Sequence, residues 1–308
     1  LIPRFREYWI VYIFTFGAVA GNVFFPVWFF QGLERMKYIT AINLMIKLVF
    51  TASIFIFIKT KADYLYVPVI NSCGYVIAGA FSLWVLHKHF QVKFRAPSFV
   101  TMMEEMKDGW YVFISTMAIS LYTNTNTFLL GLFTNNVIVG YYSAAEKIIN
   151  IVQGMYMPLS QSVYPFISKM ASESREKALR FLNRTRYLLS GVTLVSSLLI
   201  FIFARPIVNI ALGPEYARSV NVLRILAAIP FIVGVATIYA KFFLLGFGYL
   251  KELSRIIIIC SLISLLLAIF LIHLLSLAEI GAAITWIIVE CFVLLLSYLS
   301  YRRLVICR

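Results

Sequence analysis

Charged residues are scarce in this sequence. Only 13% of the 308 residues are Asp, Glu, Lys or Arg, whereas a soluble domain usually carries about 25%. Hydrophobic residues make up 62% of the chain, and its mean hydropathy is +0.90. A chain this apolar has more hydrophobic surface than one soluble core can bury. The composition therefore excludes an ordinary soluble domain and predicts an integral membrane protein.

Catalytic and metal-binding motifs are also missing. The sequence contains no GxSxG, HExxH, GxGxxG or phosphate-binding P-loop pattern, so neither an enzyme nor an ATP-hydrolysing machine is predicted. The four cysteines show no CxxC spacing, and three of them lie inside apolar runs. This spacing favours neither a disulfide nor a zinc site. We expect no catalytic residue, no metal and no resident cofactor.

Nine apolar runs dominate the chain, and each is long enough to cross the hydrocarbon of a bilayer as a helix, which takes about 20 residues. The runs lie near residues 9–30, 39–58, 64–86, 109–132, 136–166, 187–204, 220–246, 254–274 and 279–300. The fifth run contains Pro158 and Pro165, so we expect it to kink or to end early. The fold class predicted from this pattern is an all-α integral membrane protein with about nine transmembrane helices.

Basic residues outnumber acidic residues, which gives a formal net charge of +14. They fall between the apolar runs and do not share one face, so no nucleic-acid partner is predicted. Alternate connections, starting after the first run, contain 17 Lys and Arg residues against 6 in the other set. Because basic loops stay on the cytoplasmic side, this bias predicts a cytoplasmic C-terminus.

Polar side chains inside the apolar runs recur at helical spacing. In the fifth run, for example, Ser143, Glu146, Asn150 and Gln153 follow one another by three or four residues, which keeps them on one helix face. Similar stripes occur in the second, third, fourth and seventh runs. They predict a wet interior between the helices. The alternative is adhesion between helices through small polar side chains.

Full charges inside the runs are better candidates for a binding site, because a charge in hydrocarbon is costly and a poor adhesive. Glu146 either carries a coupling proton or pairs locally with a neighbouring charge, and Lys241 either faces a cavity or extends to the nearby membrane surface. Glu290 belongs to the same class, with Trp286 on its helix face and no partner identifiable from the sequence. The predicted substrate-binding residues are Asn43, Lys47, Asn124, Glu146, Lys147, Asn150, Gln153 and Lys241.

Several segments resemble a known family. The sequence FFPVWFFQGLERMKYI at residues 24–39 and the block VGYYSAAEKI at residues 139–148 are similar to motifs of the Wzx-type flippases for O-antigen and related polysaccharides. These flippases form a polysaccharide-transporter branch of the superfamily that includes the MATE exporters. The resemblance implies twelve helices in two halves around a central cavity. This chain, which begins at Leu1, matches from the fourth helix onward.

The resemblance therefore implies a truncated two-half bundle. Residues 1–95 would be the remainder of the N-terminal half with three transmembrane helices. Residues 96–308 would be the C-terminal half, with an amphipathic helix followed by six transmembrane helices.

The family implies a function in the bacterial inner membrane. Its members flip an undecaprenyl-pyrophosphate-linked oligosaccharide from the cytoplasmic to the periplasmic leaflet. The lysines of the predicted site would attract the pyrophosphate, and a proton or a sodium ion would couple the cycle. Membrane lipids, an O-antigen polymerase and a chain-length regulator are the expected partners.

Three alternatives remain open at this point. The first is a MATE-like exporter of small molecules, which is disfavoured because the predicted interior leans basic and cationic drugs would prefer an acidic cavity. The second is a membrane-embedded enzyme of polysaccharide assembly, and the third is a structural partner of the assembly complex without transport of its own.

Overall fold

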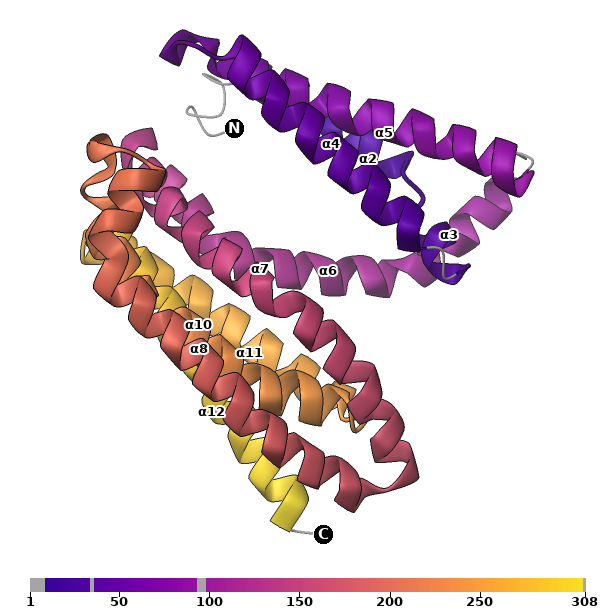
Figure 1. The fold of residues 1–308 in the computed structure, drawn as a ribbon, viewed down its shortest axis with the longest axis vertical. Coiled ribbons are helices and arrows are strands. Elements are labelled where there is room, and N and C mark those ends of the chain that lie inside the picture. Colours follow the sequence, from indigo (N-terminus) through magenta and orange to yellow (C-terminus); the bar gives the residue numbers. More distant parts are fainter. Residues whose placement is uncertain (1–8, 34–35, 93–97, 307–308) are drawn as a thin grey trace. The chain divides into compact units, whose positions relative to one another are not determined.

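The computed structural model describes residues 9–33, 36–92 and 98–306, with the chain almost entirely helical and no strand in these ranges (Figure 1). Contacts between residues divide the chain into two compact units, residues 1–102 and residues 103–308. We call them the N-terminal unit and the C-terminal unit and describe each by itself.

The N-terminal unit consists of α2 (Trp9–Val23), α3 (Val27–Gly32), α4 (Met36–Phe57), the 3-10 turn η1 (Lys61–Leu65) and α5 (Tyr66–Phe90). Both α2 and α4 pack against α5. The approach of α2 to α5 is close because Gly21 carries no side chain; a Cβ there would lie 2.7 Å from the carbonyl oxygen of Tyr75. The short α3 is held by aromatic rings: Phe30 is fully buried, stacks on Tyr38 and meets Phe90 edge to face.

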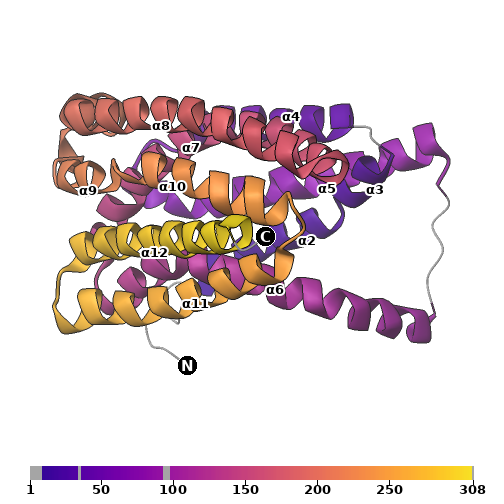
Figure 2. The same ribbon diagram turned by 90° about the horizontal axis from the view of Figure 1, so that it is seen from below.

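The C-terminal unit is a bundle of longer helices. Its elements are α6 (Phe99–Phe133), α7 (Asn136–Glu173), α8 (Arg175–Ala211), the 3-10 turn η2 (Pro214–Tyr216), α9 (Ser219–Leu226), α10 (Ile229–Thr237), the π-helical η3 (Ile238–Leu245), α11 (Leu250–Ala268), the π-helical η4 (Ile269–Leu274) and α12 (Ala278–Ile306). Helix α10 packs against both α8 and α12, and α12 also packs against α11 (Figures 1 and 2).

Two apolar clusters hold this bundle together. One gathers buried residues from α6, α7, α8, α9 and α12 around Leu130, Tyr142 and Leu223. The other lies around Leu182 and Phe243, and it joins α8, η3 and α11. The polar side chains described below therefore lie within a bundle that is held together mainly by apolar contacts.

The predicted helical membrane architecture is confirmed. Six helical segments among the described residues are long and apolar enough to cross a membrane, and the shorter α2 is also apolar; the count of nine spans stays a prediction. Of the two outcomes expected for the fifth run, a kink or an early end, the early end is wrong, since α7 stays helical as far as Glu173; the kink stays a prediction. The helix that contains the sixth run is longer than the predicted span 187–204, because α8 begins at Arg175 and ends at Ala211.

Candidate functional site

A polar cavity of about 200 Å³ lies inside the C-terminal unit. Side chains from five helices, α6, α7, α10, α11 and α12, form its wall. Polar groups in the hydrocarbon region are expected to face a cavity or a partner, because lipid cannot hydrogen-bond to them. The polar lining residues are Asn124, Asn126, Glu146, Asn150, Gln153, Ser264 and Glu290.

Two carboxylates from different helices face this first cavity. The Thr127 hydroxyl donates a hydrogen bond to Oε2 of Glu146 at 3.0 Å. The indole N–H of Trp286 donates to Oε1 of Glu290 at 3.3 Å, and Glu290 is only 9% exposed. Both donors are neutral, so they fix the orientation of the carboxylates without supplying a compensating positive charge.

Two amide side chains of the first cavity have unused hydrogen-bonding capacity. Asn126 is 7% exposed, and its Oδ1 has no hydrogen-bond partner among the described residues. The same holds for Nε2 of Gln153, which is also buried. A buried polar atom without a partner costs about 1–3 kcal/mol. The cavity therefore offers one acceptor and one donor to a bound molecule.

A second cavity of about 230 Å³ adjoins the first and shares Gln153 and Val233 with it. Helices α7 and α8 and the α10–η3 segment form its wall, and Lys241 is the charged side chain that lines it. Lys241 lies in the π-helical turns of η3 and is half-buried. Such turns are frequent at functional sites because they re-aim side chains within a helix.

The structure groups five of the eight predicted site residues. Asn124, Glu146, Asn150 and Gln153 line the first cavity, and Lys241 lines the second together with Gln153.

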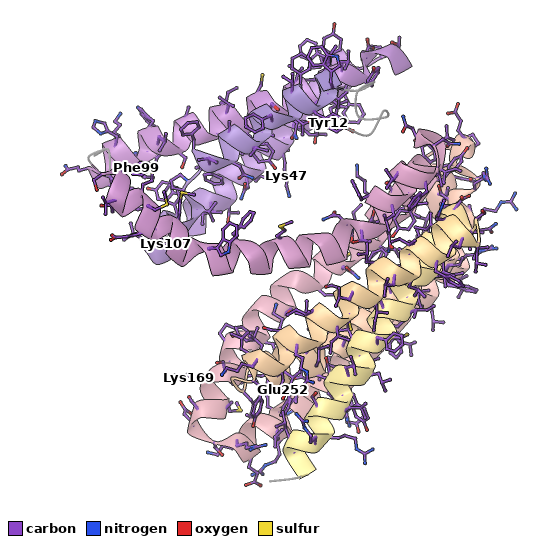
Figure 3. The ribbon with its side chains drawn as sticks, turned by 180° about the vertical axis from the view of Figure 1, so that it is seen from behind. Tyr12, Lys47, Phe99, Lys107, Lys169 and Glu252 are labelled. Atoms are coloured by element: carbon purple, nitrogen blue, oxygen red, sulfur yellow. The ribbon has the colours of Figure 1, made fainter. Side chains whose placement is uncertain are left out.

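The other three predicted residues lie elsewhere. Lys147 is exposed on α7, one position after a residue of the cavity wall. Asn43 and Lys47 lie on α4 of the N-terminal unit, where Lys47 is exposed (Figure 3).

Sequence reasoning missed several lining residues. Asn126 is two positions after Asn124, so it does not share the helix face of the polar side chains that recur at helical spacing in the fourth run. Ser264 lies in a run that shows no polar stripe, yet it is buried against the first cavity. The sequence indicates Trp286 only as a neighbour of Glu290 on its helix face, whereas in the structure its indole N–H donates a hydrogen bond to Glu290.

The charge of the first cavity differs from the prediction of a basic interior. Its charged lining residues are Glu146 and Glu290, whereas Lys241 belongs to the adjoining cavity. The prediction was wrong here because it counted charges by their position along a run. The direction of a side chain around its helix decides what it lines, and this direction depends on the neighbouring helices.

Comparison with known proteins identifies relatives. Residues 1–171 match the model of the family described as "Polysaccharide biosynthesis protein". A "Putative O-antigen transporter" of Escherichia coli (strain K12) is 33% identical over 309 residues, which cover 100% of this chain and 74% of that protein. A protein of the same name from Shigella dysenteriae is 29% identical over 271 residues, covering 87% of this chain and 67% of that protein.

A solved structure shares the fold. An outward-facing multidrug resistance MATE family transporter of the MOP superfamily matches with a TM-score of 0.55 and 13% identity, over 78% of this chain and 56% of that chain. The match spans less than two thirds of that transporter's length and shows the helical fold alone. Together with the apolar helices, these matches establish a multi-pass membrane protein with a MATE-like fold. On the family match over residues 1–171 and the 33% identity, the chain belongs to the polysaccharide biosynthesis protein family.

Proposed function

We propose that this chain acts as a flippase in the bacterial inner membrane. It would carry an undecaprenyl-pyrophosphate-linked oligosaccharide, an O-antigen repeat unit or a related one, from the cytoplasmic to the periplasmic leaflet, and its own C-terminus would be cytoplasmic. The names of the two relatives support transport of O-antigen as the cargo. In this proposal the chain transports its cargo and does not catalyse a reaction. The proposal also divides the chain into the remainder of an N-terminal half, residues 1–95, and a C-terminal half, residues 96–308.

The observation that carries the proposal is the pair of adjoining cavities inside an apolar bundle, the first lined mainly by polar side chains and the second containing Lys241. Amide and hydroxyl side chains can replace the water that hydrogen-bonds a glycan, while the polyprenyl tail stays among the lipid chains. Cavities of about 200 and 230 Å³ are smaller than the roughly 300–1,000 Å³ of ordinary ligand sites. An oligosaccharide therefore requires the bundle to open, as alternating access does.

The charged residues have different parts in this cycle. Lys241 attracts the pyrophosphate, because a cation in a cavity of low dielectric is a strong anchor for an anionic group. Asn43, Lys47 and Lys147 are assigned to the same substrate path by their position in the apolar runs.

A coupling ion would use the opposite charge. Glu146 in the acidic first cavity binds the proton or the sodium ion whose gradient drives the cycle. Asn124, Asn150 and Gln153 hydrogen-bond the sugar hydroxyls on the wall of the same cavity.

The anchor role of Lys241 is tested by complementation of a strain that lacks the gene. Lys241→Ala should abolish or strongly reduce surface O-antigen, with lipid-linked units accumulating on the cytoplasmic leaflet, whereas Lys241→Arg should retain transport. Lys177→Ala, at an exposed position of α8, removes the same charge as a matched control and should be silent. Undiminished O-antigen in the Lys241→Ala strain at normal expression would remove this lysine from the mechanism.

Export of cationic small molecules is a second candidate, and the carboxylates of the first cavity are the observation that favours it. It predicts that overexpression raises resistance to cationic dyes and that Glu146→Gln abolishes this resistance. The flippase proposal predicts no dye resistance, and a loss of O-antigen with Glu146→Gln. Altered O-antigen chain length with normal flipping would instead indicate a role in polymerisation.

A further inference from the structure

A groove of about 280 Å³ lies between α11 and α12, in the C-terminal unit and separate from the two polar cavities. Its walls include Ile259 and Leu299, and Arg255 and Arg303 line it as well. The groove thus combines an apolar surface with two guanidinium groups. The groove shares no lining residue with either of the two cavities, and the proposed transport cycle assigns it no role.

The apolar part of the groove faces the surroundings of the bundle. Ile259 is 39% exposed and Leu299 is 50% exposed. Both belong to helical segments long and apolar enough to cross a membrane. In a membrane protein such side chains meet lipid, and a groove between two spans accommodates an acyl chain better than a flat surface because it contacts the chain on two sides.

The cationic part lies at one end of the two spans. Arg255 is near the start of α11, and Arg303 is near the end of α12. The two helices are consecutive and packed together, so the start of α11 and the end of α12 lie at the same end of the unit. Figure 3 shows Glu252 and Lys169 toward this end. An arginine at the end of a span lies at the level of the lipid headgroups.

An ion pair orients one of the two arginines. Nη2 of Arg303 is 2.9 Å from Oε1 of Glu252, and this contact joins α12 to α11 across the mouth of the groove. With Lys251 and Arg302 beside them in the sequence, the cluster has three more positive than negative side chains. Glu252 therefore holds Arg303 in place without neutralising the cluster.

We propose that this groove is a binding site for an anionic phospholipid of the surrounding leaflet. The phosphate accepts hydrogen bonds from Arg255 and Arg303, and one acyl chain lies in the groove over Ile259 and Leu299. The positive charge selects an anionic headgroup, and the lipid-facing apolar wall selects a membrane lipid over a soluble phosphate. The inference depends on the membrane location of the chain and not on its cargo.

The test measures phosphatidylglycerol bound to the full chain by native mass spectrometry, with phosphatidylcholine as the neutral probe and glycerol phosphate as the soluble probe. Arg255→Gln and Arg303→Gln should each weaken phosphatidylglycerol binding about fivefold, from roughly 1 kcal/mol per arginine at a membrane surface. Leu299→Trp fills the groove without changing its charge and should weaken binding at least as much. Arg303→Lys should retain most of the affinity for phosphatidylglycerol.

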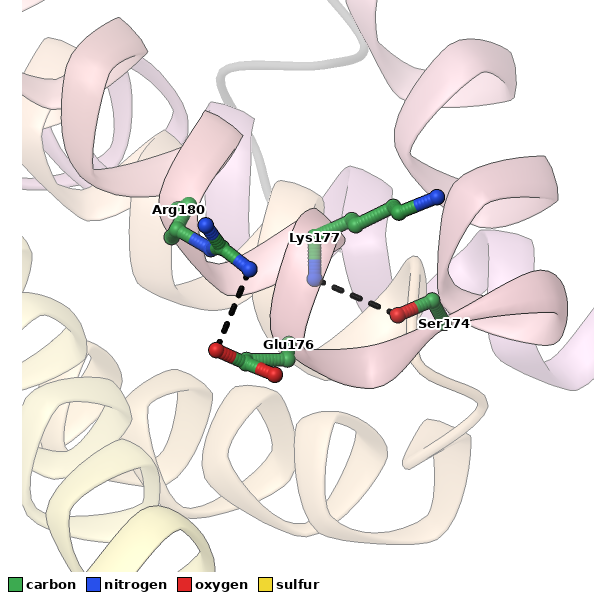
Figure 4. Close-up of polar contacts among 4 residues, drawn as sticks. All are labelled: Ser174, Glu176, Lys177 and Arg180. Carbon is green, nitrogen blue, oxygen red and sulfur yellow. Dashed lines mark hydrogen bonds and ion pairs between the residues drawn. The ribbon is translucent and has the colours of Figure 1, made fainter.

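Arg180→Gln is the matched control. Arg180 is exposed on α8 and pairs with Glu176 at 3.1 Å, so the substitution also removes an arginine from a surface ion pair (Figure 4). The start of α8 is at the same end of the unit as the end of α12, because Nη2 of Arg175 donates to the carbonyl oxygen of Leu304 at 2.6 Å. The control should leave phosphatidylglycerol binding unchanged.

Three results would overturn the proposal. Equal weakening by Arg180→Gln would show attraction by general surface charge. Equal binding of phosphatidylcholine would show an unselective lipid belt. Binding of glycerol phosphate as tight as that of phosphatidylglycerol, with Leu299→Trp silent, would show an anion site without a lipid groove. If Arg303→Gln does not elute as a single folded species, Arg255→Gln and Leu299→Trp decide the outcome.

Discussion

The contact between Gly234 on α10 and Thr193 on α8 offers a direct test of how these two helices pack beside the second cavity. A Cβ at Gly234 would lie 2.6 Å from Cγ2 and 2.7 Å from Oγ1 of Thr193. Thr193 cannot easily turn away, because it is fully buried and its hydroxyl donates to the carbonyl oxygen of Leu189 at 2.8 Å. Gly234→Ala must therefore push the two helices apart or break this hydrogen bond.

The size of the effect follows from these two routes. Overpacking a well-packed interior costs typically about 1–3 kcal/mol, and loss of the buried hydrogen bond adds about 1 kcal/mol. We expect Gly234→Ala to lower the free energy of unfolding by about 3 kcal/mol. Thr193→Ala removes both of the atoms that lie closest to the new methyl group. The double variant should therefore recover about 1–2 kcal/mol relative to the sum of the single changes.

The assay is thermal unfolding of the detergent-solubilised protein for both single variants and the double variant. Gly191→Ala on α8 serves as the matched control, since no atom outside its own helix lies within 4 Å of a Cβ at that position. This control should be neutral or slightly stabilising, because alanine favours the helix. A neutral Gly234→Ala, or a double variant no better than additive, would refute the proposed contact.

Two further predictions concern other contacts. Gly21→Ala should destabilise the N-terminal unit by about 3 kcal/mol, because the new methyl group would meet the backbone of Tyr75, which cannot rotate away. Gly74→Ala is the control and should be tolerated, since its Cβ would lie at an ordinary contact distance of 3.4 Å from Cγ2 of Ile46. Thermal unfolding compares the two variants. Arg218→Gln should cost more stability than Glu279→Gln in the same assay. The first change leaves a buried carboxylate without its partner at 3.4 Å, whereas the second leaves only an exposed guanidinium; equal costs would contradict this asymmetry.

The membrane fold could be predicted from the sequence because the governing rule is local. A run of about 20 apolar residues satisfies its backbone polar groups within one helix, whatever its neighbours are. Helix ends were less predictable. Helix α8 begins at Arg175, well before its apolar run, and its first turn is capped by Ser174, whose hydroxyl accepts from the backbone N–H of Lys177. Capping and charge extend a helix into water, where hydropathy has no signal.

Part of the candidate site could be predicted for a related reason. Glu146, Asn150 and Gln153 follow the period of one helix, and this period brings all three to the first cavity. Asn126 and Ser264 could not be found in this way. Each lines the first cavity only because side chains of other helices close the cavity around it. The periodicity of a single run contains no information about those neighbouring helices.

The neighbours Glu146 and Lys147 show why the charge of an interior is not the sum of the charges in its helices. Adjacent residues point about 100° apart around a helix, so one of them can line a cavity while the next is exposed, as these two are. A count by position alone would treat the two charges as cancelling. The observed arrangement instead leaves the carboxylate inside, and the second carboxylate, Glu290, arrives from α12. The first cavity thus has a chemistry that favours a cation. Under the proposed function, the anionic head of the lipid-linked cargo would find its counter-charge in the adjoining cavity at Lys241. For a transporter that couples an ion to an anionic cargo, this separation keeps the two ligands from neutralising each other's sites.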